Sequence, residues 1–183
     1  MEFWDLYDEN KLPTGKTIQK GEKVKKGFYR IVVHICIFNN NNEILIQRRK
    51  DTKKVFPSLW DLSVGGSVIT KETSRQAAER ELREELGVKH LLKEDRPLFS
   101  YSFENGFDDF YFIKTDLPLS SLKLQDSEVE RVKWASKEKV LELLNNGEFV
   151  PYFSFILENL FATAQNLEKV KTNLFNIEEK NNG

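Results

Sequence analysis

The stretch Gly66–Val88 constrains the fold most, because it specifies a glycine turn, a helix start and a helix end within one short run. Thr73 is followed three residues later by Gln76, a spacing typical of a capping box, in which each side chain bonds the other residue's backbone N–H. Gly87 suits the left-handed conformation found just past a helix C-terminus. We therefore predict a helix that starts after Thr73 and stops before Gly87. Its apolar positions recur at the four-residue interval of a helix face that packs on a sheet: Ala78, Leu82 and Leu86.

The same helix carries acids where acids are unfavourable. Glu81, Glu84 and Glu85 are i, i+3 and i+4 neighbours, so their charges repel one another. They also lie toward the helix C-terminus, where the macrodipole favours cations. A positive partner is needed to offset this, and a hard divalent cation, which prefers oxygen ligands, is the simplest one. Such a cation would also accept the oxygens of a substrate diphosphate.

The composition is that of one soluble domain. Of the 183 residues, 39% are hydrophobic and 12% aromatic, which is enough for a substantial core. A net charge of −1 gives no broad attraction to nucleic acid or to acidic membranes. No apolar run has the length of a membrane span, the N-terminus lacks the apolar stretch of a secretory signal, and the lone Cys36 cannot form an internal disulfide. We expect a cytoplasmic protein.

Apolar and β-branched runs predict the remaining elements. Residues 29–38 form the strongest strand, which is apolar on both faces and is therefore expected near the centre of a sheet. Asn105-Gly106, between two apolar runs, is a hairpin signal because both residues tolerate positive φ. By the same reasoning we expect strands at 2–7, 16–18, 43–49, 59–64, 98–103, 107–115 and 129–135, and helices at 136–145 and 152–165. These patterns alone reach only a single mixed α/β domain.

The stretch Gly66–Val88 resembles the Nudix box. That pattern is Gly, five residues, Glu, seven residues, Arg-Glu, an aliphatic residue, one residue, Glu-Glu, one residue, Gly and an aliphatic residue. The chain matches every fixed position: Gly66, Glu72, Arg80, Glu81, Leu82, Glu84, Glu85, Gly87 and Val88. At average amino-acid usage, chance produces such a match with a probability on the order of 10⁻⁹ per starting point.

The resemblance implies an α/β fold, namely a Nudix-type α/β/α sandwich with a mixed sheet in a single domain. We expect an N-terminal extension with short strands at 1–28, the Nudix hydrolase domain at 29–165 with its box at 66–88, and a polar tail at 166–183. The implied enzyme is a pyrophosphohydrolase that depends on a divalent metal. It would cleave a diphosphate bond in a nucleoside diphosphate derivative or related small organic diphosphate, by attack of water at phosphorus.

Family roles carry over to individual box positions. The implied ligands of Mg²⁺ or Mn²⁺ are Glu84 and Glu85, helped by Glu81 and by the backbone carbonyl of Gly66. Arg80 is expected to pair with Glu72 and so to orient the carboxylates. The general base is left open between Glu81 and an acid of the later hairpin, Asp108 or Asp109. These two aspartates could equally belong to a polar turn.

Three residues outside the box are candidates for substrate contact. Arg48 and Arg49 follow an apolar strand at a point where basic residues of this family often touch substrate phosphates, although a solvated strand end explains them nearly as well. Trp60 could stack on a base, but a large aromatic residue beside a strand is more often part of the core.

The flanks of the box suggest a second enzyme class. The segments EFWDLYDEN, FPSLWDLSVGG and FDDFYFIKT together resemble the Nudix subgroup similar to isopentenyl-diphosphate isomerases. Such an isomerase uses a catalytic cysteine at the residue before the box glycine, where this chain has Gly65. Cys36 is expected in an apolar strand as an inert thiol and does not replace it. Hydrolysis is therefore the preferred prediction.

A third alternative is a Nudix module that binds a nucleotide without catalysis, which is disfavoured because such modules usually lose box glutamates. The segment 20–26 is basic but short, and a solvated loop explains it better than nucleic-acid binding. His34 is expected in the core strand and His90 on the surface, so a zinc site is not predicted. The aromatic helix at 152–161 could supply a homodimer patch, although burial in its own core is favoured. The sequence does not identify the substrate.

Overall fold

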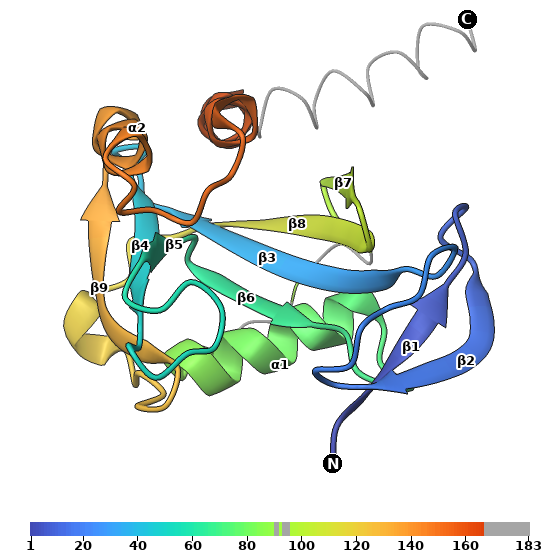
Figure 1. Cartoon of the computed structure of the whole chain (residues 1–183). Helices are drawn as coiled ribbons and strands as arrows, with labels where there is room; N and C mark the ends of the chain where they lie inside the picture. The colour runs from blue at the N-terminus through green and yellow to red at the C-terminus, as the bar shows by residue number, and fades with distance from the viewer. Residues whose placement is uncertain (90–91, 93–95, 167–183) are drawn as a thin grey trace, which may run out of the picture.

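A central mixed sheet lies between helices on both of its faces (Figure 1). The computed structural model describes residues 1–89, 92 and 96–166. Helix α1 (Ser74–Leu86) covers one face, and α2 (Lys137–Asn145) lies on the other together with a helix over residues 154–166. This arrangement confirms the predicted α/β/α sandwich.

Within the described residues, the main sheet has seven strands. They are β3 (Arg30–Phe38), β4 (Ile44–Arg49), β5 (Trp60–Asp61), β6 (Val64–Ser67), β7 (Phe99–Phe103), β8 (Gly106–Lys114) and β9 (Val129–Ala135). The order is β5-β4-β3-β8-β7, with β6 also paired to β3 and β9 also paired to β4. β3 and β8 are parallel and the other pairs are antiparallel, so the sheet is mixed, as predicted.

β3 and β4 are paired only close to the turn that joins them. Phe38 pairs with Ile44, and away from that pair β3 runs beside β6 while β4 runs between β5 and β9. The sheet therefore splits, and β6, which contains the first box residue, lies on the β3 side of the split.

The single strand predicted at 59–64 is wrong, because this segment contributes to two strands on different partners. β5 ends at Asp61 and β6 begins at Val64. Between them, the Ser63 hydroxyl donates to the Leu45 carbonyl on β4 and accepts from the Ile37 amide on β3. This side chain thus replaces ladder hydrogen bonds where the two strands separate.

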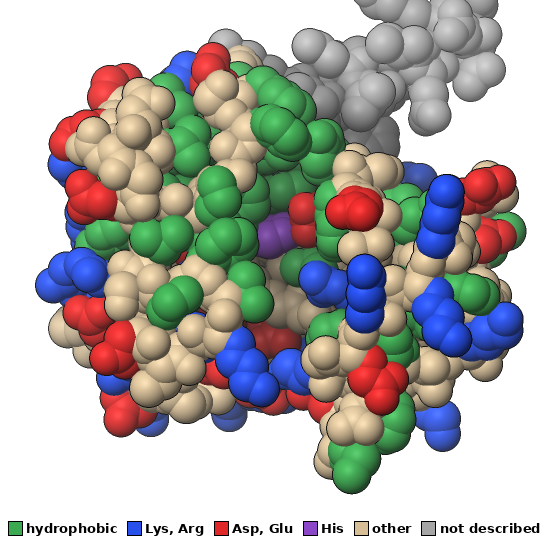
Figure 2. Space-filling model, in the orientation of Figure 1, with side chains coloured by type: hydrophobic (Ala, Val, Ile, Leu, Met, Phe, Trp, Pro, Cys, Tyr) green, Lys and Arg blue, Asp and Glu red, His purple; other side chains and the backbone are tan. Residues whose placement is uncertain are grey.

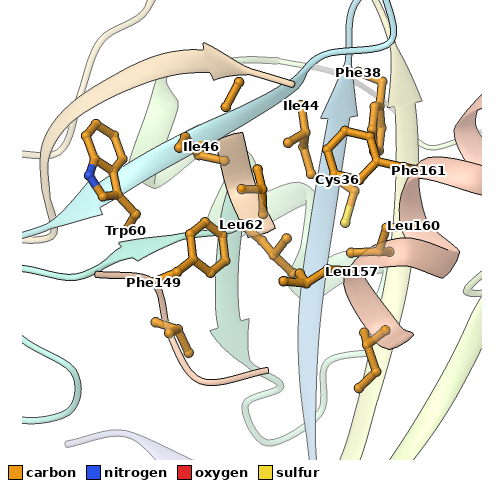
Figure 3. Close-up of a cluster of buried hydrophobic side chains, with 14 of the residues drawn as sticks. Cys36, Phe38, Ile44, Ile46, Trp60, Leu62, Phe149, Leu157, Leu160 and Phe161 are labelled. Carbon is orange, nitrogen blue, oxygen red and sulfur yellow. The ribbon is translucent and has the colours of Figure 1, made fainter. Parts of the chain in front are cut away.

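The two faces of β3 belong to two different cores, as expected for a strand that is apolar on both sides. The core beside α1 takes alternate residues of β3: Ile31, Val33, Ile35 and Ile37. Cys36 and Phe38 point to the opposite face, where they pack against Leu157, Leu160 and Phe161 of the helix at 154–166 (Figure 3). The predicted inert position of Cys36 agrees with its complete burial.

Both predicted ends of α1 are present. Thr73 accepts a 3.2 Å hydrogen bond from the Gln76 amide, and the Gln76 side chain accepts a 2.9 Å bond from the Thr73 amide. Gly87 has φ of 69° and its N–H donates to the Arg83 carbonyl at 3.0 Å. The predicted apolar stripe is completely buried: Ala78, Leu82 and Leu86.

The N-terminal segment forms a separate two-stranded sheet from β1 (Phe3–Tyr7) and β2 (Pro13–Gln19). Backbone hydrogen bonds between Tyr7 and Tyr29, at 2.8 and 2.9 Å, attach it to the main domain. None of the helices in the described part of the chain is both long and apolar enough to span a membrane. The predicted polar tail at 166–183 lies outside the described residues except for its first position.

Candidate active site

β6 and α1 bring the first and last parts of the box into contact. A Cβ placed on Gly66 would lie 2.0 Å from Oε1 and 2.1 Å from Cδ of Glu81. Side-chain atoms do not approach this closely, so only glycine lets the backbone of β6 pass the Glu81 carboxyl group. The main chain at Gly66 and the Glu81 carboxylate can therefore face one ligand together.

Arg80 organises the acids around this contact. It donates to both carboxylate oxygens of Glu72, at 2.9 and 3.0 Å, and to the Ser67 carbonyl at 3.1 Å. Its Nη1 also donates to Glu81 at 2.7 Å and to Glu84 at 3.2 Å. The predicted pair with Glu72 is present. Arg80 thus supplies part of the positive charge that the acids need.

Glu85 makes no ion pair with Arg80, and its side-chain partner among the described residues is the neutral Gln47. Glu85 is 5% exposed, and its Oε2 accepts a 2.8 Å hydrogen bond from Nε2 of Gln47 on β4. Burial, followed by the negative charge of Glu81, raises the pKa of Glu85 to about 8. An amide cannot neutralise the ionised carboxylate. A bound cation would stabilise the ionised form that the protein environment disfavours.

The donor chemistry fits a hard divalent cation. Carboxylate and backbone carbonyl oxygens are the ligands that Mg²⁺ and Mn²⁺ prefer. In the described part of the chain, no group of three His, Cys, Asp or Glu side chains already stands in a metal-binding arrangement. Glu81 and Glu84 are instead hydrogen-bonded to Arg80. The Glu84 side chain is 43% exposed, so it has room to turn toward a cation.

The two aspartates of the later hairpin face opposite sides of β8, because successive strand residues alternate. Asp109 is 1% exposed and lies at the N-terminus of α1, where it accepts from Ser74 at 2.6 Å and pairs with Lys11. This position is remote from the C-terminal end of the helix that carries Glu85. Asp109 therefore connects β8 to the start of α1, and Asp108 is the hairpin acid that faces the opposite side. A role for either of them as the base stays a prediction.

Arg48 and Arg49 also alternate, so at most one of them can face the box. Arg48 pairs with Glu130 on β9 at 3.1 Å. Arg49 donates to Asp61 on β5 at 3.0 Å, and Asp61 lies opposite Gln47, the partner of Glu85. Arg49 therefore shares the side of β4 that carries Gln47, and its contact with substrate stays a prediction.

Trp60 lies in the core below α2 and is 5% exposed. The ammonium group of Lys133 lies 4.2 Å from the centre of its ring and the Arg131 guanidinium lies 5.4 Å away. Because its ring is covered by the chain itself, the predicted base-stacking role is wrong, and the alternative of a core residue is correct.

A polar group that the sequence did not predict lies in a hollow of the surface. Figure 2 shows one histidine at the floor of this hollow. It is His34, because the described residues include no other histidine. Its Nε2 lies 2.9 Å from Oδ1 of Asp108, and its Nδ1 lies 3.4 Å from the Tyr152 hydroxyl. Tyr152 in turn donates to Asp61 at 2.8 Å.

His34 is buried in the strand, as predicted, but its two ring nitrogens contact polar side chains. A polar residue within the apolar run at 29–38 was the only signal in the sequence. Nothing in the sequence pattern places Tyr152 beside it, because that contact joins residues far apart in the chain. The surface position predicted for His90 lies outside the described residues.

Comparisons with known proteins agree with this architecture. The model of the NUDIX domain matches residues 28–153. The chain is 51% identical over 161 residues to an uncharacterized Nudix hydrolase of Listeria innocua, which covers 88% of this chain and 94% of that protein. It is 28% identical over 184 residues to the isopentenyl-diphosphate delta-isomerase of Schizosaccharomyces pombe, with 84% and 79% covered. The crystal structure of DR0079 from Deinococcus radiodurans superimposes with a TM-score of 0.73 at 26% identity and covers 87% of this chain and 99% of that one.

An α/β/α sandwich whose box helix presents clustered glutamates beside a glycine of the adjacent strand defines a Nudix-fold protein. The chain belongs to the Nudix family. The predicted class of enzyme, a Nudix pyrophosphohydrolase, is confirmed at this level, and so is the similarity to the isomerase-like subgroup.

Proposed function

We propose that the chain is a divalent-metal-dependent hydrolase that cleaves a diphosphate bond in a nucleoside diphosphate derivative or a related organic diphosphate. Mg²⁺ or Mn²⁺ is the proposed cation. The observation that carries this proposal is Glu85, a buried carboxyl group next to Glu81 for which the described part of the chain provides no cationic partner. A protein retains such an unfavourable group where a ligand compensates it.

The box residues have two proposed roles, which are to bind the cation and to orient its ligands. Glu84 and Glu85, with Glu81 and the Gly66 carbonyl, would hold the cation. When bound, the cation supplies positive charge to offset the charge that develops on the leaving phosphate. Arg80, anchored by its two bonds to Glu72, fixes the orientation of the acids.

Glu81 is the proposed base, since it is the box acid in contact with both Arg80 and Gly66. It takes a proton from the attacking water as the oxygen bonds to phosphorus. The anhydride P–O bond then breaks, and its electron pair leaves with the departing phosphate.

A screen for cleavage of the diphosphate bond, in which the phosphorylated products are separated by chromatography, tests this proposal. The substrates are nucleotide sugars, free nucleotides and prenyl diphosphates, each measured with Mg²⁺, with Mn²⁺ and with a chelator. Glu84→Gln is the matched control, because an amide keeps the shape of the side chain and removes its charge. We expect metal-dependent turnover of at least one diphosphate by the parent and not by the variant. Turnover of none of them, or equal turnover by both proteins, would contradict the proposal.

Isomerisation of isopentenyl diphosphate is the second candidate, since isopentenyl-diphosphate delta-isomerases align along most of the chain. It is disfavoured because Gly65 offers no thiol. Cys36 does not replace it: burial raises the pKa of this completely buried thiol, which keeps it protonated. Formation of the allylic isomer by the purified protein would overturn this preference.

Several expectations stay predictions. These are the extent of the hydrolase domain at 29–165, a cytoplasmic location, a homodimer formed through the aromatic helix, and the absence of nucleic-acid and membrane partners. The small-molecule diphosphate is the partner on which the proposal rests.

A further inference from the structure

The hollow beside the box presents hydrogen-bond acceptors more than donors. The partner of His34 Nε2 is a carboxylate oxygen of Asp108, which can only accept, so Nε2 carries the proton. In the neutral imidazole this leaves Nδ1 as an acceptor, and its 3.4 Å contact with the Tyr152 hydroxyl is long because that hydroxyl hydrogen points to Asp61. The hydroxyl hydrogen of Tyr152 is donated to Asp61, so the Tyr152 oxygen also has only lone pairs to offer.

The two aspartates of the hollow, Asp61 and Asp108, differ in the number of hydrogen bonds that they accept. Asp61 is saturated, because Tyr152 and the Leu62 amide donate to Oδ1 and Arg49 donates to Oδ2. Among the described residues, Asp108 has His34 as its hydrogen-bond partner through Oδ1, and its Oδ2 receives no hydrogen bond. A negatively charged acceptor therefore remains available beside the imidazole.

Gly65 leaves space in front of these acceptors. It pairs with His34 across β3 and β6, and a Cβ built on it would lie 3.4 Å from His34 Nδ1. With only hydrogen at this position, a ligand atom can approach the acceptor edge of the ring. The next residue, Gly66, faces Glu81 on the other side of β6, so this one strand separates the space from the proposed diphosphate site.

Aromatic residues form one rim of the hollow. Tyr101 lies directly opposite Asp108 across β7 and β8. Phe153 and Phe155, which are 62% and 56% exposed, stack on one another and contact the Tyr101 ring edge-on. These rings offer apolar contact to either a flat ring or a hydrocarbon chain. The hydrogen-bond acceptors at the floor of the hollow therefore decide which of the two binds.

We propose that His34, Asp108 and Tyr152 form a specificity subsite that recognises hydroxyl groups on the organic part of the substrate. A hydroxyl donates to Nδ1, to the free Asp108 oxygen or to the Tyr152 oxygen. A phosphate offers no donor and is repelled by Asp108. A prenyl chain would desolvate these acceptors without pairing them. This inference rests on the proposed function, since the box next to the subsite must hold the diphosphate.

Binding measurements test the subsite independently of turnover. Calorimetric titrations with Ca²⁺ in place of Mg²⁺ compare ADP-ribose, which is rich in hydroxyls, with geranyl diphosphate, which has none outside the diphosphate. The variants are Tyr152→Phe, which removes one oxygen, and Asp108→Asn, which replaces the free acceptor without changing its size. Tyr29→Phe is the matched control, because its ring packs on Phe107 away from the hollow. Thermal unfolding checks that each variant is folded.

The parent is expected to bind ADP-ribose more tightly than geranyl diphosphate. Each subsite variant should lower this preference about three- to tenfold, as expected for loss of one hydrogen bond, and Tyr29→Phe should leave it unchanged. A parent without the preference, including one that binds neither probe, would overturn the subsite, and so would folded variants that retain it. Preference without cleavage of any diphosphate would refute hydrolysis alone, whereas diphosphate cleavage without preference would refute the subsite alone.

Discussion

Replacing Gly66 by Ala is the sharpest test of how the box is assembled. The added methyl group would lie 2.0 to 2.5 Å from three atoms of the Glu81 side chain, far inside van der Waals contact. The backbone at Gly66 lies in a strand and its φ is not positive, so alanine introduces no backbone strain. The Glu81 side chain therefore has to move, and the change acts on one carboxylate.

The magnitude follows from what holds that carboxylate. Glu81 would lose its 2.7 Å hydrogen bond from Arg80 and its position beside β6. Overpacking of this kind costs about 1–3 kcal/mol of the free energy of unfolding. Loss of supporting groups around a metal site typically costs about 10–100-fold in metal affinity, and displacement of a ligand costs at least as much. We expect a folded protein with Mn²⁺ affinity reduced by about 100-fold or more.

Gly65→Ala is the matched control for metal affinity. Its Cβ would meet His34 Nδ1 at 3.4 Å and the Val33 carbonyl at 3.6 Å, which are ordinary contacts. Calorimetric titration with Mn²⁺ and thermal unfolding of both variants separate the two effects. If Gly66→Ala binds Mn²⁺ as tightly as the parent, or if both variants weaken binding equally, the proposed role of Glu81 is refuted.

Further predictions concern single side chains. Glu84→Gln should leave thermal unfolding unchanged, because the side chain is half-exposed, and should lower metal-dependent turnover by about 100-fold or more; normal kcat would contradict its assignment as a ligand. Asp109→Asn should lower the free energy of unfolding by about 1–3 kcal/mol, because it leaves Lys11 without its partner, while kcat stays within about twofold; a large loss of kcat at normal stability would restore a catalytic role. Arg80→Lys should weaken Mn²⁺ binding about 10–100-fold because lysine cannot bridge both oxygens of Glu72, and titration checks this against the parent. Cys36 should resist a thiol reagent at pH 8 until the protein unfolds, and rapid labelling of the native protein would contradict its burial.

Local patterns predicted those parts of the fold that depend on neighbouring residues. The capping box at Thr73, the glycine cap at Gly87 and the buried stripe are properties of one helix, and all were predicted correctly. The strand at 29–38 was placed centrally because its residues are apolar on both faces, and the structure uses both faces.

The errors concern the direction in which side chains point across the sheet. Asp108 and Asp109 look alike in the sequence, and the pairing of β8 with β3 decides which one meets His34. The sequence did not decide whether Trp60 is a core residue or a substrate contact. The pairing of β5 with β4 decides it, because this pairing places Trp60 in the core. Such assignments require the register between strands, which no local pattern encodes.

The burial of Glu85 could not be predicted from the neighbouring sequence either. Its spacing from Glu81 predicted a shared acidic face and a need for positive charge. The structure shows that Arg80 meets this need for Glu81 and Glu84 but not for Glu85. Which acid remains uncompensated depends on Gln47, a residue of a distant strand.

The central claim is that the box acids hold a divalent cation, and crystals grown with Mn²⁺ test it most directly. An anomalous difference map should contain a peak coordinated by Glu84 and Glu85, with the Gly66 carbonyl and Glu81 alongside. An acidic cluster without such a peak, both alone and with a bound diphosphate, would contradict the account.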